Sequence, residues 1–371
     1  MMSARFLTVV LERAFNMRDG FGREIDYMRI SVIDSCNLNC YYCNPCDNNE
    51  HCHALNILSV KEVLCIVRAA TRLGIKHFRL TGGEPLLHPQ LDEMVLQIKK
   101  IPGVSSVSLT TNAVLLAQHA KWLKEAGIDS INVSLDTIDA SEYERITKKP
   151  LLEEVKNGIN AAIECGIRVK INVVLTPQTD VVALTRYVAK KGTDIRFIEM
   201  MPIGEGHTNG VEPYKKVIGT LSKLYGEPCR INTEKTKEIN SGNDKRKIPD
   251  NGPAEYYIFP ELGIRVGLIQ AIHGKFCDTC NRIRVTADGR LMPCLGSSVT
   301  MDLVPDSWDF ADDVEKDFAI VRALRAAIKA KPRCHNFNDN AVTYTKTTET
   351  KTTEIEAAEV NAARNMSRIG G

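Results

Sequence analysis

Apolar residues in the first two thirds of the chain alternate between short β-rich runs and longer segments with helical spacing. The short runs predict strands at Tyr27–Ile33, Lys76–Thr81, Val104–Thr110, Asp129–Asp136, Ile167–Leu175 and Asp194–Met200. The segments between them predict helices at Ser59–Leu73, His88–Ile101, Leu115–Ala126, Leu151–Cys165 and Asp180–Lys191. Because each strand is followed by a helix, the pattern predicts right-handed crossovers and a parallel sheet.

Capping residues support these helix boundaries. Ser59 and Glu62 have the spacing of a capping box, and glycines that commonly end helices follow three of the segments, at Gly74, Gly127 and Gly166. Six strand–helix units are too few for a closed eight-stranded barrel. The expected fold is therefore α/β, an open (β/α)6 partial TIM barrel whose functional residues lie on the loops that follow the strands.

The periodic pattern weakens after Pro213. We expect an N-terminal extension at 1–26, the partial barrel at 27–212, a C-terminal region at 213–335, and a low-complexity tether with a Gly-Gly tail at 336–371. The tether includes Thr343–Val360, which holds seven threonines with Lys and Glu between them.

Composition excludes several classes of protein. Hydrophobic residues make up 43% and charged residues 25%, which is ordinary for a soluble globular protein. The net charge of +2 gives no general attraction to nucleic acid or membrane, so we expect neither partner. No apolar run reaches 18 residues, and the N-terminal segment lacks a small-residue cleavage site. Twelve cysteines then suit a reducing compartment, and we expect a cytoplasmic protein.

The first candidate site is a run of three cysteines, Cys36, Cys40 and Cys43, in a C-x3-C-x2-C spacing. Three thiolates on one short loop can bind three corners of a [4Fe–4S] cluster and leave the fourth iron open for chemistry. A structural zinc site normally has four ligands, and a disulfide framework would not usually place three cysteines so close together. An adventitious zinc or redox loop is the alternative.

A second triplet, Cys277, Cys280 and Cys294, lies in the C-terminal region. A C-x2-C pair by itself is most often a zinc or redox motif, but the sequence has no second such pair to complete a zinc ribbon. His273 is the nearest candidate for a fourth zinc ligand. With three protein ligands, this site too would keep an open position.

Cations in apolar surroundings indicate an anionic ligand. Arg282 and Arg284 are two residues apart, so on an extended segment both point to one face, where guanidinium groups can bind phosphate bidentately. Further cations occur within or beside core-like strands, at Arg29, Arg79, Lys170 and Arg196. Because a buried, unpaired cation is costly, these positions predict a cavity that binds an anion such as a nucleoside triphosphate.

The segment Gly82-Gly83-Glu84-Pro85 directly follows the second predicted strand, and paired glycines allow close backbone approach. Together with the first triplet and Tyr42, it resembles the radical S-adenosylmethionine (SAM) superfamily over roughly residues 20–210. Other segments resemble the GTP 3′,8-cyclase family within it: Leu109–Asn112, Asn132–Asp136, Val169–Val174, Arg196–Met201, Phe276–Arg284, Cys294 and Met366–Gly371.

This resemblance implies SAM and two [4Fe–4S] clusters as cofactors, with the second cluster on a C-terminal extension and in contact with the guanine ring. It implies that SAM is bound by Tyr42, Gly83, Ser134 and Met201. It implies that GTP is bound by Arg29, Arg79, Thr110, Lys170, Arg196, Arg282, Ile283 and Arg284. It also assigns a catalytic role in the radical step to Gly370 and Gly371 at the end of the chain.

The implied reaction converts GTP to 3′,8-cyclo-7,8-dihydro-GTP, the first step of molybdenum cofactor biosynthesis. It implies an electron donor and a downstream pterin-forming enzyme as partners, and it is compatible with a homodimer. One alternative is a peptide-modifying radical SAM enzyme with an auxiliary cluster. A second alternative, from another class, is a non-catalytic metal-binding protein.

The chain departs from the family pattern in three places. His77 stands where relatives often have a lysine, which affects one expected phosphate contact. Extra metal-binding residue types occur where relatives have an acidic loop, at Cys46, His51, Cys52 and His53, so a further metal site there is an alternative to an ordinary loop. The threonine-rich stretch separates the tail motif from the rest of the chain.

Overall fold

The computed structural model describes residues 17–43, 56–203, 210–231, 252–297, 299–303, 313–335 and 337. Six parallel strands form the middle of one mixed sheet and pair in chain order, as the sequence predicts. They are β1 (Tyr27–Ser31), β2 (His77–Thr81), β3 (Ser106–Thr111), β4 (Ser130–Ser134), β5 (Val169–Val174) and β6 (Asp194–Ile198).

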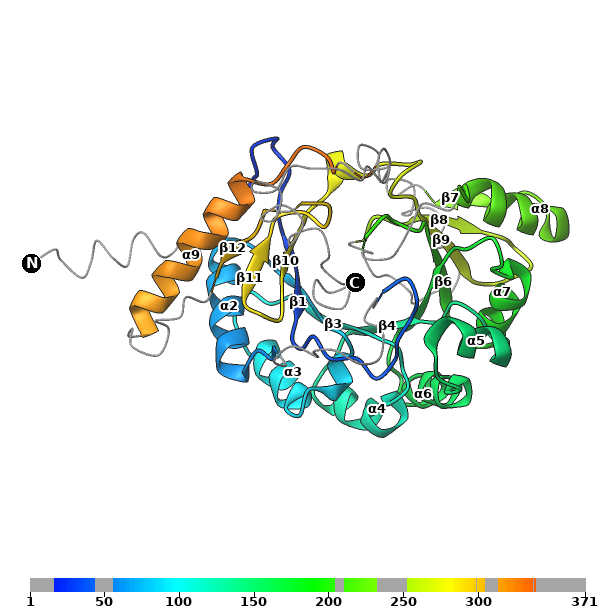
Figure 1. Ribbon diagram of the computed structural model, residues 1–371, viewed down its shortest axis with the longest axis horizontal. Coiled ribbons are helices and arrows are strands. Elements are labelled where there is room, and N and C mark those ends of the chain that lie inside the picture. The colour runs from blue at the N-terminus through cyan, green and yellow to red at the C-terminus, as the bar shows by residue number, and fades with distance from the viewer. Residues whose placement is uncertain are drawn as a thin grey trace, which may run out of the picture.

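The predicted helices cover the outer face of the curved sheet (Figure 1). They are α2 (Val60–Arg72), α3 (Leu91–Lys99), α4 (Leu116–Glu125), α6 (Leu152–Glu164) and α7 (Val181–Lys190). The capping box of Ser59 and Glu62 is present at the start of α2. The sequence pattern did not predict α5 (Ala140–Thr147) or the short 3-10 turn Pro85–Leu87.

The C-terminal region adds strands to both sides of the six-stranded centre. On one side, β9 (Arg265–Ile269) pairs with β6, followed by β8 (Glu255–Ile258) and β7 (Cys229–Ile231). On the other, β10 (Arg282–Val285) pairs with β1, followed by β11 (Arg290–Met292) and β12 (Met301–Asp302). Among the described strands, β7 and β12 are the two edges of the sheet and do not pair with each other, so the expected open barrel is confirmed.

Two more helical segments belong to this region. A π-helical turn, Tyr214–Ile218, leads into α8 (Gly219–Tyr225), while α9 (Asp313–Lys329) packs against α2 on the outside of the barrel (Figure 1). The single sheet runs through both halves of the chain, and the division at residues 212 and 213 stays a prediction. Within the described residues, every helix is too short or too polar to cross a membrane.

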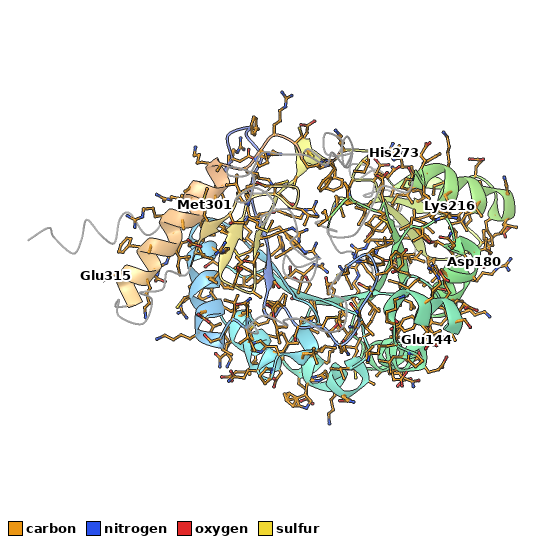
Figure 2. All side chains as sticks on the ribbon, viewed as in Figure 1. Glu144, Asp180, Lys216, His273, Met301 and Glu315 are labelled. Atoms are coloured by element: carbon orange, nitrogen blue, oxygen red, sulfur yellow. The ribbon has the colours of Figure 1, made fainter. Side chains whose placement is uncertain are left out.

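Alternation along the strands separates the core from the barrel interior. In β1 and β2, Met28, Ile30, Phe78 and Leu80 are fully buried in the hydrophobic core. The residues between them point to the opposite face, because successive side chains on a strand alternate. Charged side chains such as Glu144 and Asp180 lie at the periphery (Figure 2). The inner face therefore carries the polar residues that form the site.

Candidate active site

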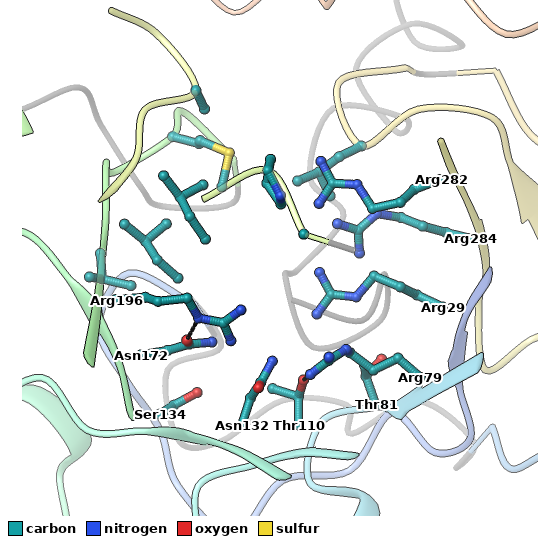
Figure 3. Close-up of a pocket in the computed structure, with 18 of the residues that line it drawn as sticks. Arg29, Arg79, Thr81, Thr110, Asn132, Ser134, Asn172, Arg196, Arg282 and Arg284 are labelled. Carbon is teal, nitrogen blue, oxygen red and sulfur yellow. Dashed lines mark hydrogen bonds between the residues drawn. The ribbon is translucent and has the colours of Figure 1, made fainter. Parts of the chain in front are cut away.

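The barrel encloses a cavity of about 620 Å³, which both cysteine triplets line. Small-molecule sites usually have volumes of roughly 300–1,000 Å³. Polar side chains from the inner faces of β1 to β6 and from β10 form its walls (Figure 3). The cavity therefore has room and polar partners for small-molecule ligands.

The first triplet lies on the loop that follows the carboxyl end of β1, where barrel enzymes usually place chemistry. The loop after β2 packs directly against it. Gly83 N donates to Ile33 O at 2.8 Å, and a Cβ atom on Gly83 would lie 2.1 Å from Ser35 O. The glycine therefore allows two loops to meet, a more specific role than general access for a ligand.

Glu84 connects this loop to the end of β3. Its buried carboxylate accepts hydrogen bonds from Thr111 Oγ1 and Asn112 N, both at 2.7 Å. Asn112 Nδ2 in turn donates to Asn37 Oδ1 at 2.7 Å and lies 3.8 Å from Cys36 Sγ. Burial, only partly offset by these hydrogen bonds, raises the pKa of Glu84 to about 7. Three loops are thus fixed around the first triplet.

Asp136, after β4, holds the far side of the same loop. Its Oδ2 accepts a hydrogen bond from Tyr42 OH at 2.5 Å, and its Oδ1 accepts one from Val174 N at 2.8 Å. Burial raises the pKa of Asp136 to about 6. The sequence placed Asp136 in a family segment but assigned it no role. Its position two residues after Ser134, on the inner face of the sheet, is the signal that could have identified it.

All candidate SAM residues line the one cavity, namely Tyr42, Gly83, Ser134 and Met201. Two of the thiols beside them, Cys36 and Cys40, have raised pKa values. Burial raises the pKa of Cys36 to about 11. Burial and then the negative charges of Cys43 and Asp136 raise the pKa of Cys40 well above its ordinary value. Binding of a metal cluster at this end therefore has to displace protons from the thiols.

The second triplet lies at the opposite end of the barrel. Cys277 and Cys280 precede β10, whose first residue, Arg282, is opposite Tyr27 at the start of the parallel strand β1. The chain returns to this end through the antiparallel strand β11 and then reaches Cys294. Two loops from different parts of the C-terminal region therefore form this site.

Cations surround the second triplet. Burial opposes ionisation of Cys280, but Arg282 and Lys331 outweigh it and lower the pKa of Cys280 to about 7. The pKa of Cys277 is raised, chiefly by burial. The nearest expected zinc ligand, His273, instead bonds through Nδ1 to the carboxylate of Glu199.

The two triplets differ from a site for a single metal ion. In the described part of the chain, no three His, Cys, Asp or Glu side chains are close enough together to hold one ion. Tetrahedral zinc requires its ligands around one centre, at about 2.3 Å for each sulfur. A [4Fe–4S] cluster binds each thiolate on a different iron, which requires wider spacing. Each triplet supplies three free thiols, which is the set of ligands that a [4Fe–4S] cluster with one open iron requires.

A wall of arginines lies between the triplets. Arg284, Arg29 and Arg79 stand in register on the neighbouring strands β10, β1 and β2, and Arg282 lies beside them (Figure 3). Burial, followed by repulsion from the other guanidinium groups, lowers the pKa of Arg29 well below its ordinary value. The same causes lower the pKa of Arg284 to about 10. The expected cation-lined cavity is present.

The opposite wall is less charged. Arg196 points into the cavity and donates through Nε to Asn172 Oδ1 at 2.9 Å (Figure 3). Thr110 and Lys170 also line the cavity. Ile283 does not, because it alternates with Arg282 and Arg284 and its fully buried side chain packs in the core.

Two polar residues in the cavity were missed from the sequence. Asn132 Oδ1 and Thr81 Oγ1 are buried and have no hydrogen-bond partner among the described residues. Both line the cavity, so a bound molecule could satisfy them. His77 also lines the cavity and bonds through Nδ1 to Ser106 Oγ at 2.8 Å.

Some candidates lie outside the described residues. These are Gly370 and Gly371, the threonine-rich stretch, and the loop residues Cys46, His51, Cys52 and His53.

An open partial barrel with a three-cysteine loop after β1 defines the radical SAM class, and comparison with known proteins agrees. A model described as the radical SAM superfamily matches residues 30–183. One described as Molybdenum Cofactor Synthesis C matches residues 193–337. Among solved structures, that of Streptococcus suis SuiB covers 81% of this chain and 68% of its own, with a TM-score of 0.54 and 14% identity. The match to the structure of anSMEcpe with bound AdoMet covers 80% of this chain and 82% of the anSMEcpe chain, with a TM-score of 0.50 and 16% identity.

Curated relatives identify the family within the radical SAM class. The GTP 3′,8-cyclase of Clostridium perfringens is 36% identical over 86% of this chain and 95% of its own length. That of Pelotomaculum thermopropionicum is 37% identical over 86% and 95%. The chain belongs to the GTP 3′,8-cyclase family. The resemblance seen in the sequence is thereby confirmed, while the likeness to the solved structures, at these identities, concerns the fold.

Proposed function

We propose that this protein converts GTP to 3′,8-cyclo-7,8-dihydro-GTP, the first step of molybdenum cofactor biosynthesis. The observation that carries the proposal is one cavity with a cysteine triplet at each end and an arginine wall between them. The cyclase relatives match 95% of their own length, which supports the same reaction. The cofactors are SAM and two [4Fe–4S] clusters.

At the first end, Cys36, Cys40 and Cys43 would hold one cluster. When bound, this cluster and SAM supply the radical that removes hydrogen from the ribose 3′ carbon of GTP. The chain's own residues position and shield the reactants. Tyr42, anchored by Asp136, and Gly83, packed against the cysteine loop, form a rigid wall for SAM, together with Ser134 and Met201.

At the other end, Cys277, Cys280 and Cys294 would hold the second cluster beside the guanine ring. Arg29, Arg79 and Arg284 would bind the triphosphate, because a phosphate chain offsets the repulsion between guanidinium groups that lowers the pKa of Arg29 and of Arg284. Further contacts to GTP are proposed for Thr110, Lys170, Arg196 and Arg282. Ile283 would contribute through its backbone, since its side chain faces the core.

The remaining partners are proposed from the family resemblance. They are an external electron donor, a downstream pterin-forming enzyme and, for the assembly, a homodimer, with the cytoplasm as the compartment. Gly370 and Gly371 are proposed to enter the cavity during the radical step, because glycines occupy little space beside two bound ligands. Removing both residues should leave iron content and SAM cleavage intact and abolish the cyclised product.

The test is anaerobic reconstitution with iron and sulfide, followed by an assay with SAM, a reductant and GTP. Formation of 3′,8-cyclo-7,8-dihydro-GTP supports the proposal. SAM cleavage that GTP does not influence would favour the peptide-modifying alternative. Reconstituted protein that binds metal without cleaving SAM would favour the metal-binding alternative.

A further inference from the structure

Lys331 is a buried cation close to the second triplet, and nothing in the sequence assigned it a role. It follows the end of α9 and is 3% exposed. Its Nζ donates to Arg282 O at 2.8 Å and to Pro293 O at 2.9 Å. An ordinary lysine at a helix end would instead bond the last carbonyls of its own helix or extend into water.

The two carbonyls belong to the two chain segments that carry the triplet. Arg282 comes two residues after Cys280, and Pro293 immediately precedes Cys294. One ammonium group therefore joins the two parts of the site. The lysine also lines the cavity, and an ammonium group has three N–H donors, one more than these two carbonyls use.

In the part of the chain that the structure describes, Lys331 has no carboxylate to balance its charge. Among the described residues, no Asp or Glu forms an ion pair with its Nζ, although a buried ammonium is costly without an anion nearby. Nearby Arg23 provides a contrast. It also braces the site, donating to Cys277 O at 2.6 Å and Pro332 O at 2.6 Å, but its charge is paired with Asp19 at 2.5 Å.

The ligand that the second triplet would hold is itself an anion, and it could balance the charge of Lys331. A [4Fe–4S] cluster with three thiolates carries net negative charge, and net charge and hydrogen bonds set the potential of such clusters. We propose that Lys331 is the positioning residue of the second cluster, which joins its two cysteine loops and raises its reduction potential by stabilising the more negative, reduced form. The proposal rests on the proposed function only in requiring a cluster at Cys277, Cys280 and Cys294.

The experiment compares Lys331→Met with Lys329→Met, an exposed lysine two residues away that loses the same charge. Both are made in the full chain with Cys36, Cys40 and Cys43 changed to alanine, so that the remaining iron reports the second site. Iron content, iron release to a chelator and the potential at half reduction, followed by electron paramagnetic resonance, are measured anaerobically.

Lys331→Met should lower the potential and speed iron release at least roughly tenfold, as expected for loss of a charge-assisted hydrogen bond. Lys329→Met should match the parent. Lys331→Arg, which keeps the charge, should restore the potential even where iron release stays fast.

Equal potentials and release rates in Lys331→Met and Lys329→Met would overturn the proposal. So would general unfolding of Lys331→Met and Lys331→Gln alike, seen by circular dichroism, because Lys331 would then serve the fold and not the cluster. A parent chain that binds no cluster at the second triplet would instead refute the second cluster itself. These outcomes are distinct, since the last one appears before any change to Lys331.

Discussion

The two cysteine triplets bind the same kind of cofactor in the proposed enzyme, but the chain builds them differently. The first lies on a single eight-residue loop, Cys36–Cys43, and backbone contacts from Gly83 and a buried carboxylate at Glu84 brace it. The second combines two loops, which Lys331 and Arg23 hold together through main-chain carbonyls. A local motif thus specifies one site, and tertiary structure specifies the other.

The electrostatic surroundings differ as well. At the first triplet, burial raises the pKa of Cys36 to about 11, and burial with neighbouring negative charges raises the pKa of Cys40 well above its ordinary value. At the second, Arg282 and Lys331 lower the pKa of Cys280 to about 7. The second end also faces the arginine wall. The arginines Arg29, Arg79, Arg282 and Arg284 therefore gather where a triphosphate would bind.

The largest effect that separates the two sites is expected from removal of one cysteine at each. Cys40→Ala should abolish SAM cleavage and product formation, because the proposed SAM-binding residues lie beside the first triplet. Cys277→Ala should lose about half of the roughly eight irons per chain, on the basis of one cluster per triplet, yet keep reductive SAM cleavage. Anaerobic iron analysis and chromatography of 5′-deoxyadenosine measure both. Loss of SAM cleavage in Cys277→Ala would contradict the independence of the two sites.

The second largest difference between the two sites is expected from Gly83→Ala, which should affect the first cluster alone. Because the new Cβ would lie 2.1 Å from the backbone oxygen of Ser35, the β2 loop or the cysteine loop has to move. The variant should lose iron from the first cluster and weaken SAM binding at least roughly tenfold, while the second cluster stays intact. Gly219→Ala is a control for glycine replacement in general, since a Cβ there has no neighbour within 4 Å and the backbone of Gly219 has an ordinary negative φ of -61°. Retention of full SAM affinity in Gly83→Ala would show that the loops adapt.

This difference between the sites also explains what the sequence could predict. Local signals were sufficient for the six central strands, for the helices that follow five of them, and for the capping box at Ser59. They did not predict β7 to β12, since strands of two to five residues show too few alternations and pair with distant parts of the chain. Lys331 was missed for the same reason, because in sequence it is one more lysine at a helix end.

The spacing of residues in the sequence predicted only some of the side chains that line the cavity. The two-residue spacing of Arg282 and Arg284 correctly predicted a shared face, and the same rule places Ile283 on the other side. Asp136, Asn132 and Thr81 were not singled out, because a single polar residue on a strand does not reveal whether its neighbours satisfy it. Only the folded sheet shows which polar groups lack partners.

A smaller effect should result from changing the arginine wall. Arg284→Ala should weaken GTP binding by roughly 1.5–3 kcal/mol if one charge-assisted hydrogen bond is lost, with SAM affinity nearly unchanged. Arg282→Ala should weaken GTP binding to a similar degree and also disturb the second cluster, because Arg282 acts on Cys280. Equilibrium binding of GTP and SAM to reconstituted protein measures both. If neither substitution changes GTP affinity, the assignment of the wall to triphosphate is wrong.

The smallest effect requires no substitution and tests the electrostatic difference directly. In cluster-free protein, the thiolate is the form that iodoacetamide attacks, so alkylation of each cysteine should rise as pH passes through its pKa. Because the pKa of Cys280 is lowered to about 7 and that of Cys36 is raised to about 11, the half-maximal rate should come at a lower pH for Cys280. Mass spectrometry of labelled peptides from pH 6 to 10 follows Cys280 through its half-maximal rate, over a range in which labelling of Cys36 should stay well below its maximum. Chain unfolded in urea is the control, since both thiols should then titrate together near their ordinary value of about 8.5. Coincident profiles in the folded chain would contradict the inference that the cations at the second end act on its cysteines.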